Sequence, residues 1–174
     1  MGIIIIMRKA LRQLFILSLM LSISACGFSL RGSDILSSKF NSVILDSQQP
    51  NSEFTRLLNR SLEISEVEVM LTSPTEPGDD LPVLTIRNEQ IINRPITVNP
   101  RARAAQYEIR LSVDIAFINS TVQLIEPETL FVERSYFEDI ENIIGNREEV
   151  EIIAAEMRRE LVNQLIRRLA AVEL

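Results

Sequence analysis

Cys26 is the only cysteine in this chain of 174 residues, and the chain contains no histidine. A lone cysteine can be a nucleophile, a metal ligand, half of an intermolecular disulfide or a site of covalent modification. Without histidine there is no Cys–His nucleophilic pair, and one cysteine is too few for a zinc cluster or a disulfide framework. The surroundings of Cys26 must therefore decide what its thiol does.

The segment ahead of Cys26 has the three parts of a secretory signal peptide. The basic stretch MRKALRQ begins at Met7, the apolar run LFILSLMLSISA follows, and small residues precede the cysteine. The apolar run is well short of the roughly 20 residues that a transmembrane helix needs. We expect residues 1–25 to be a signal peptide, with translation starting at Met7 because the GIIII stretch before it does not belong to a normal signal.

The four residues Ile23-Ser24-Ala25-Cys26 resemble the lipobox of bacterial lipoproteins. That motif implies a diacylglyceryl thioether on the Cys26 sulfur, cleavage before Cys26 and acylation of the new amino group. Two or three acyl chains hold a protein durably, because each buried methylene contributes about 0.8 kcal/mol and one chain binds only marginally. Gly27 follows the cysteine, where lipoproteins of the inner membrane often carry Asp, so an outer-membrane anchor is expected.

Arginines gather in one short segment of a chain whose formal net charge is −6. This net charge argues against nucleic acid as a partner. Residues 93–106 include Arg94, Arg101 and Arg103 and no acid. Guanidinium groups bind phosphates through paired hydrogen bonds, so the cluster favours an anionic ligand. An ordinary charged hairpin tip, or a surface that only touches a protein partner, would contain the same residues, and both alternatives stay open.

The acidic residues show no catalytic or metal-binding pattern. Asp79 and Asp80 lie in a loop, 72–82, and lack the spacing of an EF-hand. The other acids fall on polar strand faces and on the last helix, whereas a hydrolase with paired carboxylates needs two acids in one concave site. We therefore expect that the protein is not an enzyme and has no catalytic residue. We also expect no metal site and no cofactor beyond the lipid on Cys26.

The first elements that position these residues form a strand–helix–strand unit. Strands are predicted at 42–46 and 66–71, and a helix capped by Asn51 lies between them. The apolar residues of this helix, Phe54, Leu57, Leu58 and Leu62, form one stripe. A strand that follows another strand through a helix usually pairs with it in parallel, so these two strands are expected to be parallel.

The rest of the chain predicts a meander and a long helix. Three strands are expected at 83–93, 106–117 and 129–139, the second with the clearest alternation of apolar and polar residues. A last helix is expected to open at Asn146, with Glu149 completing a capping box. Its apolar residues hold helical spacing for about six turns.

Together these elements predict an α+β fold. Two helices should pack on one face of a four- to five-stranded, mixed but mostly antiparallel sheet, as a two-layer sandwich. We expect a lipidated linker at 26–40 and one domain at 41–174. Because neighbouring strands run in opposite directions, the arginine-rich tip and the start of the last helix should share one end of the sheet, which brings Arg147 near the other three arginines.

Several segments, in this order, resemble the LptE family of lipopolysaccharide-assembly lipoproteins. They are the lipobox cysteine followed by GFSLRG (27–32), ILDS (44–47), RSYFED (134–139) and a C-terminal helix with EMRRELVNQLIRRL (156–169). The resemblance runs from Cys26 almost to the end of the chain. One departure is Ser29, in a stretch where the family often has His.

The resemblance implies an outer-membrane lipoprotein on the periplasmic side. It implies a plug that sits inside the β-barrel LptD, assists its assembly and binds lipopolysaccharide, without being an enzyme. Arg94, Arg101, Arg103 and Arg147 are then candidate ligands for lipopolysaccharide phosphates. Tyr136 and Phe137 are candidate anchors for the barrel, with core packing as the alternative. A periplasm-facing lipoprotein that binds peptidoglycan or another envelope protein is the competing interpretation.

Overall fold

The computed structural model describes residues 33–71, 81–98, 104–138 and 142–173. The signal peptide, Cys26, Arg101 and Arg103 lie outside the described residues. The elements are α2 (Ser33–Ser37), β1 (Ser42–Ser47), α3 (Glu53–Ile64), β2 (Glu68–Met70), β3 (Val83–Val98), β4 (Ala104–Asn119), β5 (Val122–Phe137) and α4 (Ile143–Ala171).

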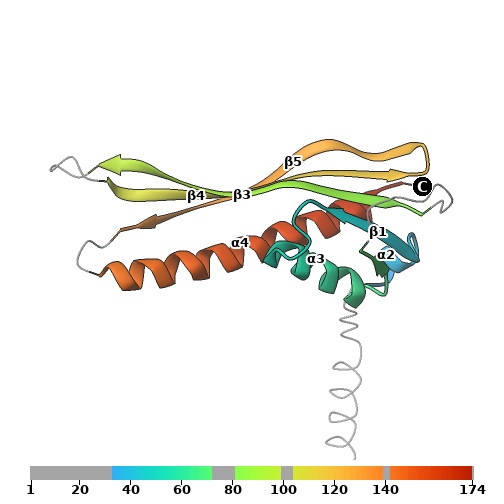
Figure 1. Ribbon diagram of the computed structural model, residues 1–174, viewed down its shortest axis with the longest axis horizontal. Coiled ribbons are helices and arrows are strands. Elements are labelled where there is room, and N and C mark those ends of the chain that lie inside the picture. Colours follow the sequence, from blue (N-terminus) through green and yellow to red (C-terminus); the bar gives the residue numbers. More distant parts are fainter. Residues whose placement is uncertain (1–32, 72–80, 99–103, 139–141, 174) are drawn as a thin grey trace, which may run out of the picture. The chain divides into compact units, whose positions relative to one another are not determined.

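The five strands form one mixed sheet in the order β2-β1-β3-β4-β5 (Figure 1). β1 is parallel to both β2 and β3, whereas β3, β4 and β5 are antiparallel neighbours. The parallel pairing of β1 and β2 confirms the strand–helix–strand prediction. The fold class is α+β, as the periodicity of the sequence predicted.

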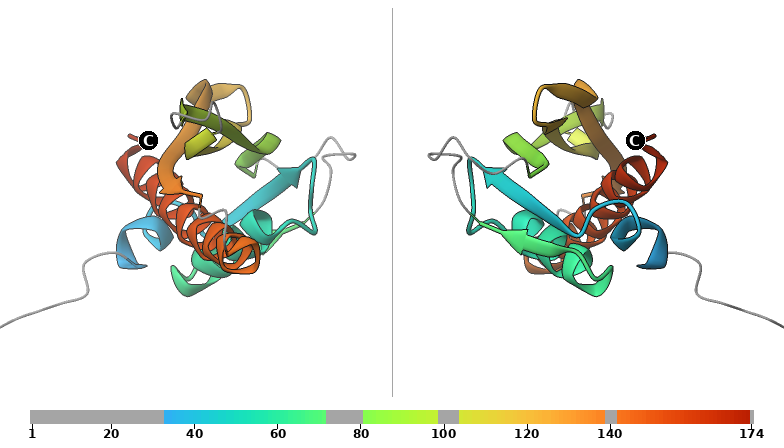
Figure 2. Two further views of the ribbon diagram at one scale, coloured as in Figure 1. Left: turned by 90° about the vertical axis from the view of Figure 1, so that its left-hand side faces the viewer. Right: turned by 90° about the vertical axis from the view of Figure 1, so that its right-hand side faces the viewer.

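Helices α3 and α4 lie on the same side of the sheet, and α4 runs along the three long strands (Figures 1 and 2). The inward side chains of β4 are almost fully buried between strands and helices, and they alternate with polar neighbours as predicted. They are Ile109, Leu111, Val113, Ile115 and Phe117. The second half of α4 completes this core with Met157, Leu161, Leu165 and Leu169.

Both longer helices begin at a residue other than the predicted cap. Ser52 caps α3, and its Oγ accepts a hydrogen bond from the Thr55 backbone N–H at 3.0 Å, so the prediction of Asn51 was wrong by one residue. Asn142 caps α4, and its Oδ1 accepts from the Gly145 N–H at 3.0 Å, so the helix starts a turn before Asn146. In each case two residues of types that favour the N-cap position lie within four positions of each other. The backbone becomes helical directly after one of them, and that residue is the cap.

The strands differ in length from the predictions. β3, β4 and β5 each have 16 residues, and β2 has only three. Pro95 and Pro127 lie inside β3 and β5, where proline normally argues against a strand. β1 pairs with β3 only at Ile44–Ser47, so Pro95 lies beyond that pairing, and β5 is the last strand of the sheet. A missing N–H is tolerated at such edges.

The domain also begins earlier than expected. Residues 33–40 were predicted as linker, but they contain α2, and Leu36 and Phe40 are buried. The Phe40 ring meets Phe117 edge to face at 5.0 Å. Lys39 Nζ donates to the carbonyl oxygens of Ala170 and Val172, each at 2.6 Å, which satisfies the C-terminal end of α4.

Candidate functional site

The β3–β4 hairpin, the end of β5 and the start of α4 meet at one end of the sheet, which we call the distal end (Figure 1). Phe137, the last residue of β5, pairs with Gln106 near the beginning of β4. Five residues separate Phe137 from the first residue of α4. The topology therefore brings together the elements that carry the predicted arginines.

Arg94 lies on β3 at the distal end and is exposed, but it is not a free cation. Its guanidinium binds Glu108 of β4, with Nη2 2.5 Å and Nε 2.7 Å from Oε1. Glu108 is 14 residues away in sequence and faces Arg94 across the strand pair, so inspection of segment 93–106 alone could not find it. An anionic ligand would have to share Arg94 with this carboxylate.

Arg147 lies near the beginning of α4 and is exposed. Among the described residues it has no ion-pair partner. Because α4 starts at the distal end, Arg147 and Arg94 belong to the same end of the sheet. Arg101 and Arg103 follow β3 in the sequence, between the described parts of the hairpin.

Tyr136 and Phe137 are neighbours in the chain with opposite environments. Tyr136 is 7% exposed, its ring stacks on Tyr107 at 5.6 Å, and its hydroxyl accepts a hydrogen bond from Asn93 at 2.9 Å. Phe137 is 71% exposed. The geometry gives Tyr136 a core role and leaves only Phe137 open to a partner. Partial burial, and next the charge and hydrogen bonding of Glu138, raise the pKa of Tyr107 above its ordinary value.

The helix-free face of the sheet combines apolar and charged side chains. Arg110 lies over the Phe131 ring, with Cζ 4.0 Å from the centroid, and pairs with Glu133 at 3.3 Å. Ile92 stands directly opposite Arg110. Exposed apolar side chains are not confined to this face but occur throughout the distal half of the domain, including the first half of α4. They are Ile91, Ile92, Ile96, Phe131, Phe137, Ile144 and Ile152. Sequence reasoning missed these side chains, because they are spread over β3, β5 and α4.

Other kinds of site are not apparent in the part of the chain that the structure describes. No three carboxylate or thiol side chains there are grouped so that they could hold a metal ion. None of the described helices has the length and apolar character required to cross a membrane. The arrangement at the distal end suits binding of a partner or an anionic ligand.

Solved structures with the same fold come from several bacteria. Rare lipoprotein B from Shewanella oneidensis superimposes with a TM-score of 0.66 over 75% of this chain and 95% of that chain, at 22% identity. An uncharacterized lipoprotein B from Nitrosomonas europaea has a TM-score of 0.66 over 83% of this chain and 91% of that chain, at 17% identity. These similarities confirm the fold.

Sequence relatives cover nearly the whole chain. The LPS-assembly lipoprotein LptE of Pectobacterium atrosepticum is 25% identical over 163 residues, 92% of this chain and 86% of that protein. The protein of the same name from Photorhabdus laumondii is 26% identical over 167 residues, 95% of this chain and 88% of that protein. A family model described as "LptE: Lipopolysaccharide-assembly" matches residues 40–169. The chain therefore belongs to the LptE family of lipopolysaccharide-assembly lipoproteins.

Proposed function

We propose that this chain is a non-enzymatic lipoprotein of the outer membrane, held on the periplasmic side by lipid on Cys26. It occupies the lumen of the β-barrel LptD, assists assembly of that barrel and binds lipopolysaccharide on its way to the outer leaflet. The observation that carries the proposal is the family match over residues 40–169. The surface of the distal end supports it.

The exposed face of the long strands suits a barrel lumen. The interior of an outer-membrane barrel is polar, so a plug needs charged and hydrogen-bonding groups on its surface. Arg110, Glu133 and Glu108 supply such groups, already paired within the sheet. Exposed aromatic residues such as Phe131 and Phe137 add the apolar contacts that dominate protein interfaces.

Lipopolysaccharide binding is assigned to the arginines of the distal end. Lipopolysaccharide presents phosphates above a bundle of acyl chains, and Arg binds phosphate through two parallel hydrogen bonds. Arg147 is exposed and unpaired among the described residues, and Arg94 is exposed beside Glu108. Arg101 and Arg103 complete the proposed set.

The first test is recovery of the full-length lipoprotein from detergent-solubilised outer membranes by affinity purification, followed by mass spectrometry. A stoichiometric large β-barrel protein that survives stringent washing is expected. Recovery of the lipoprotein alone, or with peptidoglycan-associated proteins, would contradict the plug proposal and favour an envelope-binding lipoprotein of the same fold.

A second test concerns the arginines. Reversing both charges with Arg101→Glu and Arg103→Glu should weaken binding of purified lipopolysaccharide by about tenfold or more, since 1.4 kcal/mol corresponds to a factor of ten. The circular dichroism spectrum and the urea unfolding midpoint should not change. Arg159→Glu is the matched control, because Arg159 is exposed on α4 and lies outside the distal end. Unchanged binding by the double variant would remove these residues from the site.

A further inference from the structure

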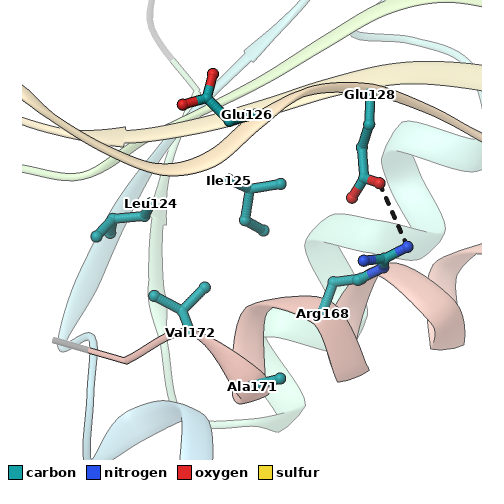
Figure 3. A pocket seen from close by; sticks show the side chains of 7 residues that line it. All are labelled: Leu124, Ile125, Glu126, Glu128, Arg168, Ala171 and Val172. Atoms are coloured by element: carbon teal, nitrogen blue, oxygen red, sulfur yellow. Dashed lines mark ion pairs between the residues drawn. The ribbon is translucent and has the colours of Figure 1, made fainter.

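An open groove lies between the first part of β5 and the last turns of α4 (Figure 3). The last turns of α4 are at the opposite end of the helix from the distal end (Figure 1). It consists of two adjoining hollows of about 380 Å³ and 220 Å³ that share Arg168 and Ala171. Leu124, Ile125 and Val172 give the larger hollow an apolar lining. Neither Arg94 nor Arg147 borders the groove.

One wall of the groove is the free edge of the sheet. β5 is the last strand in the sheet order, and β4 supplies its only strand partner among the described residues. The outward N–H and C=O groups of β5 are therefore available to another strand. An edge strand that flanks a groove beside a helix is an arrangement that binds extended polypeptide by strand addition. Pro127 and the register shift opposite it limit such pairing to the part of β5 after Pro127.

The two walls of the groove carry opposite charges. Glu126 and Glu128 lie on the strand side, and Arg167 and Arg168 lie on the helix side. Arg168 Nη2 is 3.3 Å from Glu128 Oε2, as the dashed line in Figure 3 marks. Arg167 is exposed and has no partner among the described residues. An acidic side chain on the molecule that occupies the groove would form an ion pair with this guanidinium.

We propose that this groove binds an extended polypeptide segment of the barrel partner, which adds to β5 as a further strand. Beyond the paired stretch, the segment continues over the larger hollow and places apolar side chains on Leu124, Ile125 and Val172, and an acidic side chain pairs with Arg167. The inference rests on the proposed function, because it requires that a barrel partner exists.

Two other occupants fit the groove less well. In a second copy, the acids of β5 after Pro127 are Glu128 and Glu133, and they already pair with Arg168 and Arg110, so neither is free to pair with Arg167. An acyl chain would cover the edge of β5 without satisfying its N–H and C=O groups, which is costly. An extended polypeptide satisfies the strand edge and can also supply a charge for Arg167.

The test compares amide hydrogen exchange in the purified complex of full-length lipoprotein and barrel with exchange in the free lipoprotein. The amides of β5 after Pro127 that point away from β4 should exchange at least about tenfold more slowly in the complex, because they become hydrogen-bonded. Ala171→Trp, at an exposed position that lines both hollows, should fill the groove and restore fast exchange at these amides. Arg167→Glu should also reduce the protection.

Two control variants separate the groove from the rest of the surface. Thr121→Trp adds the same bulk at an exposed position of the β4–β5 turn, outside the groove and outside the pairing part of β5, and Arg159→Glu reverses an exposed charge of α4 outside the groove. Both should retain the protection of β5 in the complex. Loss of protection in the controls as well as in the groove variants would overturn the proposal.

The remaining outcomes are distinguishable. Recovery of the barrel with unchanged exchange in β5 would overturn the groove proposal and leave the proposed function intact, whereas failure to recover any barrel would overturn both. Protection that grows with concentration of the free lipoprotein would assign the groove to a second copy. Protection on adding lipopolysaccharide without the barrel would assign it to lipid.

Discussion

At the scale of single residues, Asp114 shows how polar groups join the long strands on the helix-free face. Its two carboxylate oxygens accept hydrogen bonds from Thr129 Oγ1 on β5 and Asn88 Nδ2 on β3, each at 2.6 Å. The hydrogen bond from Thr129, followed by that from Asn88, lowers the pKa of Asp114 below its ordinary value of 3.8. Asn88 adopts a φ of 52° at a register shift, a conformation that Asn tolerates better than most residues.

The lowered pKa predicts how acid affects the domain. A carboxyl group whose pKa is lower in the folded state contributes stability above its unfolded pKa and loses it as the pH falls through the folded value. Thr129→Val should therefore raise the pKa of Asp114. The free energy of unfolding of this variant should then fall less on acidification than that of the original chain. Carboxyl carbon NMR titration measures the pKa, with Thr121→Val in the exposed β4–β5 turn as control. A titration midpoint that does not move would contradict the assignment.

At the scale of elements, α4 divides into two halves with different surroundings. Met157, Leu161 and Leu165 in its second half are fully buried, whereas Ile144 and Ile152 in its first half are exposed. The second half belongs to the core, and the first half extends along the long strands to the distal end (Figure 1). One helix thus both stabilises the domain and presents part of its proposed binding surface.

The beginning of α3 provides a test of how the sequence selects a helix start. Ser52→Ala removes the side-chain acceptor of the Thr55 N–H and should lower the free energy of unfolding by about 0.5 to 2 kcal/mol. Asn51→Ala should change it by less than about 0.5 kcal/mol, because Asn51 is exposed and caps nothing. Urea unfolding of both variants measures the difference. A larger loss for Asn51→Ala would show that Asn51 is the cap in solution.

At the scale of the described domain, stability and recognition use neighbouring but separate side chains. The buried cluster extends from Leu36 on α2 to Val172 after α4 and includes residues of all three long strands. The polar pairs and the exposed apolar side chains of the distal half lie outside it. A variant can therefore lose a surface contact while keeping the fold, so the proposed contact with the barrel can be tested one surface at a time.

The adjacent residues Tyr136 and Phe137 separate these two roles. Phe137→Ala should change the free energy of unfolding by less than about 0.5 kcal/mol and reduce the amount of barrel recovered with the lipoprotein, because its ring is exposed at the distal end. Tyr136→Ala should cost about 3 to 5 kcal/mol, as other buried aromatic truncations do. Thermal unfolding and affinity purification measure both effects. Full recovery of the barrel by Phe137→Ala would exclude that ring from the interface.

The sequence by itself determined the fold class and most of the elements. The alternation in β4 and the apolar spacing in α3 and α4 indicate which side chains are buried. A period of two residues is typical of a strand, and a period of about 3.6 residues is typical of a helix. The parallel pairing of β1 and β2 followed from the helix between them. Segments resembling the LptE family indicated membership that the family match then confirmed.

Only the tertiary structure decided which charges and surfaces are free. Glu108 neutralises Arg94 from a neighbouring strand, Tyr136 is covered while Phe137 is not, and the groove of Arg167 forms where β5 meets α4. These properties depend on pairs of residues that are distant in sequence. A local pattern sets the period of an element. Which side chains face each other depends on the register between strands and on how a helix packs against them.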